Sequence, residues 1–440
     1  MPLLSIIIPC YNSADSLDKT LLSLTQQVER NFQIIAVDHG SNDQTQAVVE
    51  RYQSTLALAY YKIPRQHFTS GEPRDFGAKK ADAPFLAFLD AGIIVPSFYT
   101  QAHIAFHQKN PHHVGIGFQH GQRSDLAGAR WIELLQTISI DKAGELVSGN
   151  PDLSDIRTVD PVKDLGRFIW YFGWSANLSM PTEAYKAVGG FDLDFEGWGF
   201  EDCALCYMLM KHGLQFAFVE NGWGIDLPHK RSSWQNRKEQ LHFNWRHFYR
   251  KQKDLDLEAL RYAEMGQATL ITFRYLQSLG RTYTDLPALP QSVLEQVTHP
   301  SLLIGGTPQD ADNFSYIALA NETVISTDTL WSCSGILIPL ADHSLETVVV
   351  SDMWKWLNRS FIVDLALTPP DPTILAGVKS EIPARVSLLE CMIAEIKRTA
   401  RQALFVNSSS FVDISERSHA STTILADLCH QYGLPFQIIS

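Results

Sequence analysis

Three acidic side chains and one arginine stand at positions where enzymes place reactive groups. Asp38 and Asp90 each follow an apolar, strand-like run, and Asp202 lies at the start of a helical stretch that begins at Glu201. A carboxylate at a strand end is a hard oxygen ligand suited to Mg or Mn. The backbone N–H groups and dipole at its helix start favour ionised Asp202, which can then accept a proton near neutral pH. Arg74 is suited to fork onto phosphate oxygens. These residue types suit a reaction in which a diphosphate departs and a hydroxyl loses its proton.

The elements that must position these groups alternate between strand and helix. Short apolar runs predict strands at Leu3–Ile8, Phe32–Val37, Ala57–Tyr61 and Phe85–Leu89, and the stretches Ser16–Gln27 and Gln44–Tyr52 predict helices between them. This order indicates a parallel sheet with crossover helices. Ligands of such sheets lie beyond the carboxyl ends of the strands, so Asp38 and Asp90 should face one crevice.

The 440 residues are too many for one typical domain. We expect a first domain at 1–250, a helical extension and linker at 251–295, and a smaller α/β domain at 296–440. The prolines in Thr284–Pro290 mark the linker. The basic and aromatic stretch His242–Lys251 could touch phosphates or a membrane, but an amphipathic helix that packs its aromatic residues on the first domain is the simpler interpretation.

Composition excludes several classes of function. The net charge of −12 makes nucleic acid an unfavourable partner. The six cysteines are sparse, and Cys203 and Cys206 fit ordinary burial better than zinc or redox chemistry. There is no run of about 18 apolar residues and no secretory signal pattern. We therefore expect a cytoplasmic protein without an integral membrane segment, which could associate peripherally with the inner membrane face.

Four short motifs occur in a recognisable order: Ser5–Asn12, Val37–Asp43, Arg74–Gly77 and Phe88–Gly92. Together they resemble the nucleotide-sugar half of a family 2 glycosyltransferase with the GT-A fold. The resemblance implies an α/β, Rossmann-like domain that binds a UDP-sugar. It also implies donor-binding roles for six residues, of which Asp38 would accept from the uracil imide: Pro9, Tyr11, Asn12, Asp38, Arg74 and Asp90.

A second pair of motifs, Phe172–Met180 and Gly189–Asp202, is similar to the acceptor half of galactosyl- and N-acetylgalactosaminyltransferases, including polymerases of chondroitin-type polysaccharides. In that pattern Asp202 is the catalytic base and Glu201 helps to hold the acceptor. Trp174 and Trp198 would line the sugar site. Related enzymes place a metal-binding histidine after this helix, so the resemblance implies that Asp90 and His229 hold a divalent cation, Mn or Mg.

The chain departs from the family pattern at several positions. The usual D-x-D motif reads Asp90-Ala91-Gly92, so the second carboxylate is absent. His39 replaces the usual second Asp of its motif, and Asp75 and Ala204 are further differences. A weaker metal site is therefore expected, or one that recruits water, His229 or another acid.

The last 140 residues predict a second parallel α/β sheet, with strands including Gly335–Leu340 and Thr347–Ser351 and helices at Val386–Ala400 and Ser421–Tyr432. The string Ile338–Met353 resembles the middle of a class I methyltransferase. However, Ser301–Pro308 lacks the full glycine-rich cofactor loop, and few residues remain for the first crossover helix. We interpret this part as a reduced, noncatalytic methyltransferase-like domain, used for acceptor binding or for assembly of a homo-oligomer.

The leading hypothesis is an inverting glycosyltransferase that moves a hexose or N-acetylhexosamine to an acceptor hydroxyl. One alternative is a catalytically retired nucleotide-sugar-binding scaffold, and another is a bifunctional protein with methyltransferase activity. The acceptor stays open among a glycan, a lipid-linked sugar, a small molecule and a peptide.

Overall fold

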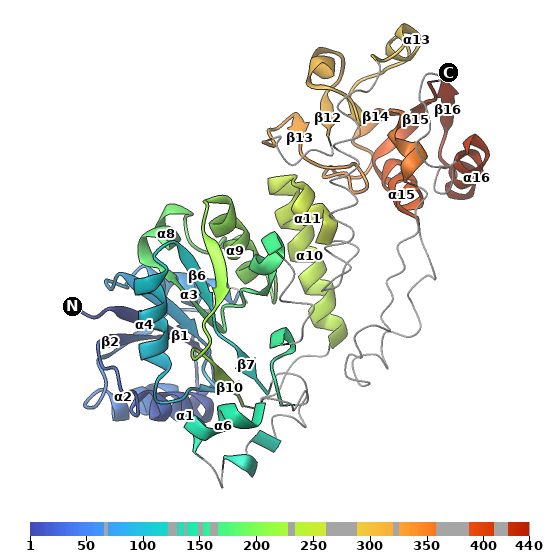
Figure 1. Ribbon diagram of the computed structural model, residues 1–440. Helices are drawn as coiled ribbons and strands as arrows, with labels where there is room; N and C mark the ends of the chain where they lie inside the picture. The colour runs from blue at the N-terminus through green and yellow to red at the C-terminus, as the bar shows by residue number, and fades with distance from the viewer. Residues whose placement is uncertain are drawn as a thin grey trace. The chain divides into compact units, whose positions relative to one another are not determined.

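The computed structural model describes residues 1–65, 69–121, 130–131, 133–135, 139–147, 153–158, 166–227, 234–260, 288–319, 325–357, 387–408 and 421–439. Contacts between Cα atoms divide the chain into two compact units, Met1–Trp245 and Arg246–Ser440 (Figure 1). The division falls within helix α10 (Trp234–Gln252). The predicted segment 251–295 contains α11 (Leu255–Ala259) and α13 (Gln291–Leu294). Residues 284–287 of the predicted linker lie outside the described residues.

Unit 1 is built on a seven-stranded mixed sheet in the order β3-β2-β1-β4-β8-β6-β9. The first four strands in this order are parallel, as predicted, and β8 runs antiparallel to both of its neighbours. The parallel half confirms the predicted α/β architecture. The strands are β1 (Leu4–Cys10), β2 (Phe32–Asp38), β3 (Leu58–Lys62), β4 (Phe85–Leu89), β6 (His113–Ile116), β8 (Asn177–Pro181) and β9 (Gln215–Phe218).

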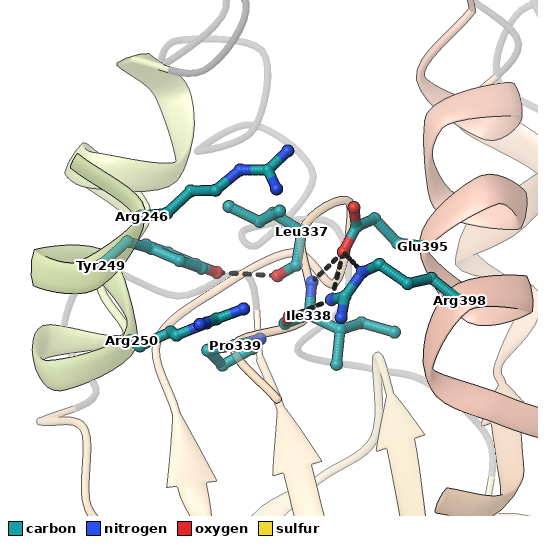
Figure 2. Close-up of a pocket in the computed structure, with 8 residues that line it drawn as sticks. All are labelled: Arg246, Tyr249, Arg250, Leu337, Ile338, Pro339, Glu395 and Arg398. Carbon is teal, nitrogen blue, oxygen red and sulfur yellow. Dashed lines mark hydrogen bonds and ion pairs between the residues drawn. The ribbon is translucent and has the colours of Figure 1, made fainter. Parts of the chain in front are cut away.

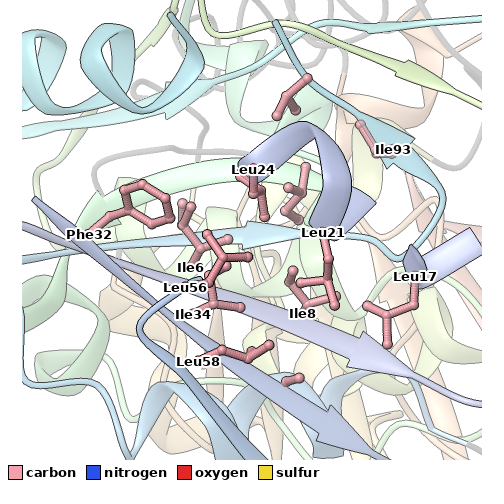
Figure 3. Packing of buried hydrophobic residues seen from close by; sticks show 14 of the residues in the cluster. Ile6, Ile8, Leu17, Leu21, Leu24, Phe32, Ile34, Leu56, Leu58 and Ile93 are labelled. Atoms are coloured by element: carbon pink, nitrogen blue, oxygen red, sulfur yellow. The ribbon is translucent and has the colours of Figure 1, made fainter. Parts of the chain in front are cut away.

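Helices cover both faces of this sheet because its central strands are apolar on both sides. On one face, α1 (Ala14–Leu24) packs its leucines, spaced one helical turn apart, onto Ile6, Ile8 and Ile34 (Figure 3). On the other face, Ile35 and Val37 pack against Phe76 of α3 (Gly71–Ala78). The alternation of Ile34 with Ile35 along β2 therefore fixes which helix lies on which side.

Unit 1 also contains a second, smaller sheet and several further helices. A small sheet joins β5 (Ile93–Ile94), β10 (Gly224–Asp226) and β7 (Gln119–His120). The remaining described helices of the unit are α2 (Thr45–Tyr52), α4 (Tyr99–Lys109), α6 (Ile140–Val147), α8 (Thr182–Ala187) and α9 (Glu201–Lys211), with the 3-10 helices η1 (Ile156–Thr158) and η2 (Gly166–Phe172).

Unit 2 contains a six-stranded parallel sheet in the order β13-β12-β11-β14-β15-β16. In sequence order this is 3-2-1-4-5-6, the order of doubly wound nucleotide-binding folds. The strands are β11 (Ser301–Ile304), β12 (Tyr316–Ala318), β13 (Leu330–Trp331), β14 (Leu345–Val350), β15 (Ala400–Val406) and β16 (Phe436–Ile439). Helices α15 (Leu388–Thr399) and α16 (Thr422–Tyr432) lie close to their predicted positions.

The predicted strand Gly335–Leu340 is wrong, because this segment forms a loop. Its N–H groups bond to carboxylates instead of to a neighbouring strand: Leu337 donates to Glu258 Oε1 at 3.0 Å and Ile338 to Glu395 Oε2 at 3.3 Å. Gly335 adopts a φ of +76°, which a strand excludes. Among the described residues, no helix is both long and apolar enough to cross a membrane.

Candidate active site

The carboxyl ends of β1 and β2 place the predicted donor residues side by side. Cys10 pairs in register with Asp38, so Tyr11 and Asn12 follow the strand next to Asp38, while Pro9 lies within β1 itself. Asn12 has a φ of +47°, and its side chain accepts the Asn42 N–H at 2.9 Å. This bond ties the loop after β1 to the loop after β2.

Asp38 is buried, at 1% exposure, and organises the loop that follows it. Its Oδ1 accepts the Ser41 N–H at 2.7 Å, and its Oδ2 accepts the Tyr60 hydroxyl at 2.6 Å. Burial and the bond to Asp38 raise the pKa of Tyr60 above its ordinary value, so the phenol stays a donor. In this structure Asp38 holds the loop after β2 through these two hydrogen bonds. Its direct contact with a uracil imide remains a prediction.

Tyr11 is a partly exposed residue whose ring carries the guanidinium of Arg65 on one face. The Tyr11 residue is 47% exposed, and the guanidinium carbon of Arg65 lies 3.6 Å from its ring centroid. Close by, His39 Nε2 lies 3.1 Å from Glu72 Oε2 of α3. Burial lowers the pKa of His39, and the carboxylate of Glu72 opposes that shift. Sequence reasoning did not identify Arg65 or Glu72, because neither lies in a family motif.

Arg74 projects from α3 into the space between Asp90 and the start of α9. Its Nη2 donates to Asp90 Oδ1 at 2.6 Å, and its Nη1 lies 3.9 Å from Glu201 Oε1. The side chain is 8% exposed, and its Nε is buried without a hydrogen-bond partner among the described residues. The structure thus places Arg74 as a shared cation between two predicted site acids, with its direct phosphate contact still a prediction.

The two acids at the start of α9 differ in their surroundings. Glu201 is 6% exposed, and burial together with the charge of Asp202 raises its pKa to about 7. Asp202 is half-buried and accepts the Cys203 N–H at 2.8 Å and the Ser175 N–H at 3.3 Å. Burial raises the pKa of Asp202, while Arg74 and these two N–H groups oppose the rise. Burial thus raises the pKa of both acids, and at Asp202 the two N–H groups favour the ionised form.

The predicted Trp174 is held by a buried ion pair that the motifs did not indicate. The guanidinium carbon of Arg157 lies 4.4 Å from the Trp174 ring centroid. Arg157 pairs with Asp155, Nη2 to Oδ2 at 2.6 Å, and donates to the carbonyls of Phe172 and Gly117. Trp198 is half-buried, in the loop before α9. The sugar-stacking roles of Trp174 and Trp198 remain predictions.

A divalent cation at this site would meet one hard oxygen ligand among the described residues. Asp90 Oδ1 accepts from Arg74, whereas the side chain is 37% exposed and Oδ2 has no hydrogen-bond partner among the described residues. Gly92 supplies no side-chain ligand, and His229 lies outside the described residues. Mg²⁺ is commonly bound by one or two carboxylates together with substrate phosphates, so Asp90 fits an ion whose coordination a diphosphate completes.

The switch point of the unit 2 sheet, between β11 and β14, is occupied by the chain's own side chains. Thr307 donates both its N–H and its hydroxyl to Asp310 Oδ2, at 2.8 and 2.9 Å. The first crossover is only the 3-10 helix η5 (Pro308–Asn313). The sulfur of Met353 lies 2.6 Å from the position that a Cβ on Gly305 would take. The Thr307 N–H after β11, which could otherwise bind an anion, is therefore already bonded to Asp310.

A pocket in unit 2 is lined by residues of α10, of the loop before β14 and of the end of α15 (Figure 2). Arg398 is already neutralised there by Glu395 and Asp342, each at 2.7 Å. The Tyr249 hydroxyl donates to the Leu337 carbonyl at 2.8 Å, as Figure 2 shows. These contacts anchor the loop that includes Leu337 to α10 and α15, and we assign the pocket no ligand.

Comparisons with known proteins match both halves of unit 1. The family model for glycosyl transferase family 2 matches residues 5–148, and the model for the N-terminal domain of galactosyltransferase matches residues 167–230. Validoxylamine A glucosyltransferase from Streptomyces hygroscopicus subsp. jinggangensis is 34% identical over 390 residues, which cover 80% of this chain and 90% of that protein.

Further matches are more distant. Chondroitin synthase from Pasteurella multocida is 25% identical over 232 residues, which cover 50% of this chain and 24% of the synthase. Among solved structures, residues 1–349 of S. aureus TarS align with a TM-score of 0.43 and 18% identity, covering 68% of this chain and 76% of that chain.

Proposed function

Since the chain belongs to glycosyl transferase family 2, we propose that it moves a hexose or N-acetylhexosamine from a UDP-sugar to an acceptor hydroxyl, with Asp202 as the base. The chain is a glycosyltransferase of the GT-A fold, and transfer in this family inverts the anomeric carbon. The identity of the base, of the sugar and of the acceptor is the proposed part.

The observation that carries the proposal is the difference between the two acids of α9. Asp202 is half-exposed and accepts two backbone N–H groups, which favour its ionised form. Glu201 is buried, and its pKa is raised to about 7. Asp202 is therefore the carboxylate that can accept a proton from a hydroxyl at neutral pH, and Glu201 is suited to hydrogen-bond the acceptor.

The proposed reaction is a single in-line displacement. Asp202 takes the proton of the acceptor hydroxyl, and that oxygen forms a bond to the anomeric carbon as the bond from this carbon to the diphosphate breaks. The electron pair of the broken bond leaves with UDP. Arg74, held next to Asp90, supplies buried positive charge on the side where the diphosphate develops its charge.

Glycosyltransferases of this fold typically use a divalent metal, and we propose Mn or Mg for this chain. Asp90 would hold the ion through its free oxygen, and His229 would be a further ligand. The ion would act as a Lewis acid on the departing diphosphate. Because Asp90 offers one oxygen and Gly92 none, the affinity for metal should be weak without a nucleotide.

The relative with 34% identity suggests where to begin with substrates. Its name describes glucosyl transfer to validoxylamine A, so we propose UDP-glucose as the donor and a small polyhydroxylated acceptor of that kind. Glycan, lipid-linked and peptide acceptors form the second set to be tested.

The test measures UDP release and product mass with the full chain, Mn²⁺, several UDP-sugars and validoxylamine A. Asp202→Asn should lower kcat by about 10²- to 10⁴-fold, the usual contribution of a positioned base, with UDP binding retained. Glu183→Gln is the matched control, because this acid is exposed on α8 and pairs only with Lys186 in the described part of unit 1.

Undiminished transfer by Asp202→Asn would remove this residue from the role of base. Binding of UDP without transfer to any acceptor would favour the retired scaffold instead. Cytoplasmic location, peripheral membrane association and a homo-oligomer formed through unit 2 are further proposals, which fractionation and light scattering can check.

A further inference from the structure

We propose that Asn244 is a positioning residue, which holds the loop before α9 so that Glu201 and Asp202 face the acceptor. This inference rests on the proposed function. Asn244 lies on the part of α10 that belongs to unit 1. No family motif of the sequence includes it.

Asn244 forms hydrogen bonds to two positions in the loop before α9. The side chain is 1% exposed, and its Nδ2 donates to the Glu196 carbonyl and to the Gly199 carbonyl, both at 2.8 Å. Gly197 and Trp198 lie between these two carbonyls. One amide group therefore fixes both ends of the turn that carries Trp198.

Gln240 lies one helical turn before Asn244 and completes this attachment. Its Oε1 accepts the Trp198 N–H at 3.0 Å. A Cβ placed on Gly197 would lie 3.0 Å from Gln240 Cδ, and one on Gly199 would lie 3.1 Å from Leu241 Cδ1. The two glycines thus permit the loop to lie directly against α10.

The loop needs such an attachment because its backbone is strained. Gly197 and Gly199 have φ values of +70° and +94°, and the next residue, Phe200, has a φ of +74°. A non-glycine residue in this region costs roughly 1–2 kcal/mol. Phe200 is buried and directly precedes Glu201, so release of its backbone would turn the two acids of α9.

The experiment compares the full-length wild type with Asn244→Ala and Asn244→Asp, with Phe243→Ala as the control. Phe243 is the neighbouring residue and is 62% exposed. Both Asn244 variants should lose at least tenfold in kcat, while the affinity for UDP changes less than twofold, because the donor residues lie on other elements. General misfolding would weaken UDP binding as well.

Two substitutions at Gln240 test the hydrogen bond to the Trp198 N–H separately from side-chain length. Gln240→Glu keeps an acceptor oxygen for the Trp198 N–H and should retain most activity, whereas Gln240→Met keeps the length without the acceptor and should lower kcat. Hydrogen–deuterium exchange of the peptide 195–203 should speed up in Asn244→Ala and stay unchanged in Phe243→Ala.

Exchange is measured without substrates, so it separates this inference from the proposed function. If the wild type transfers no sugar but Asn244→Ala loosens the loop, the positioning inference holds and the proposed function fails. Unchanged exchange in Asn244→Ala, or wild-type kcat in both Asn244 variants, would overturn the inference.

Discussion

Arg74 has a structural role in addition to the phosphate contact that its motif predicts. Its guanidinium is buried between Asp90 and Glu201, two acids from distant parts of the chain. Removing one partner of a buried, hydrogen-bonded charge pair leaves an uncompensated charge, which is strongly unfavourable. Arg74 therefore stabilises both Asp90, which is predicted to bind the donor, and Glu201, which is predicted to bind the acceptor.

The raised pKa of Glu201 links stability to pH. The folded state holds this proton up to about pH 7, whereas an ordinary glutamate, with a pKa of 4.5, releases it earlier. The unfolded state thus binds fewer protons between pH 4.5 and 7, so the free energy of unfolding falls as pH rises through this window and then levels off. At 1.36 kcal/mol per pKa unit, the loss from Glu201 is about 3 kcal/mol.

Glu201→Gln should remove this loss, because an amide does not titrate. We expect the variant to gain about 3 kcal/mol relative to wild type between pH 5 and pH 8 in urea unfolding, and to transfer sugar more slowly. Glu258 has the same raised pKa, and the buried His103 has a pKa lowered to about 4, but both are present in the two proteins and cancel in the comparison. Parallel pH profiles would contradict the prediction.

At the residue scale, sequence reasoning located acids that lie in motifs and missed residues that act through distant partners. Glu201 and Asp202 could be predicted because their type and spacing match a known pattern. The supporting roles of Asp155 and Arg157 could not, because these depend on carbonyls of Gly117 and Phe172 that only folding brings near. The same limit applies to Asn244.

At the scale of elements, the apolar runs of unit 1 predicted its parallel strands correctly. The run Ile336–Ile338 was predicted to be a strand but forms a loop. It is buried like a strand, but its N–H groups bond to buried carboxylates. Burial by itself does not distinguish a strand from a loop folded around acids, since both exclude water from apolar side chains.

The turn after β4 explains why the second acid of D-x-D cannot simply be restored. Gly92 has a φ of +111°, and hydrogen bonds hold its backbone on both sides: its N–H donates to Thr20 Oγ1 at 2.9 Å, and its carbonyl accepts the Leu227 N–H at 3.1 Å. A side chain would find space, because the nearest atom to an added Cβ is Ser16 Cβ at 3.5 Å. The penalty would therefore come from the backbone.

Gly92→Asp should destabilise the protein by about 1–3 kcal/mol, without tighter binding of Mn²⁺. Gly213→Asp is the matched control, because Gly213 has a φ of +94° and open space around it. We expect similar losses in thermal unfolding for the two variants. Undiminished stability of Gly92→Asp together with tighter Mn²⁺ binding would show that the turn adapts.

At the scale of the whole molecule, the chain contains two α/β sheets. The side chains at the carboxyl ends of their strands differ in exposure. In unit 1, Tyr11, Asp90 and Asp202 are all partly exposed at the site. In unit 2, Asp310 and Met353 occupy the switch point. The sequence predicted both sheets from strand and helix alternation.

Ligand binding should therefore be confined to unit 1. With Mn²⁺, UDP at 100 times its Kd should stabilise the full chain by about 2.7 kcal/mol, a shift in Tm of roughly 5–10 °C. S-adenosylmethionine should give no shift, since the loop after β11 lacks the full glycine pattern and its Thr307 N–H is already bonded to Asp310. A shift with S-adenosylmethionine in a thermal-shift assay would restore the methyltransferase interpretation.

The guanidinium of Arg65, which lies over the Tyr11 ring, would affect how tightly a nucleobase could stack there. A base that stacks on this ring exchanges places with Arg65, so part of its stacking energy replaces an interaction that is already present. An exposed cation–π contact contributes about 0.5–1 kcal/mol, which corresponds to roughly two- to fivefold in affinity. Exposed side chains change rotamer within nanoseconds, far faster than a donor arrives. If a base stacks on Tyr11 as the resemblance predicts, the exchange would weaken the complex without slowing its formation, and Arg65 would cover the ring again after the nucleotide leaves.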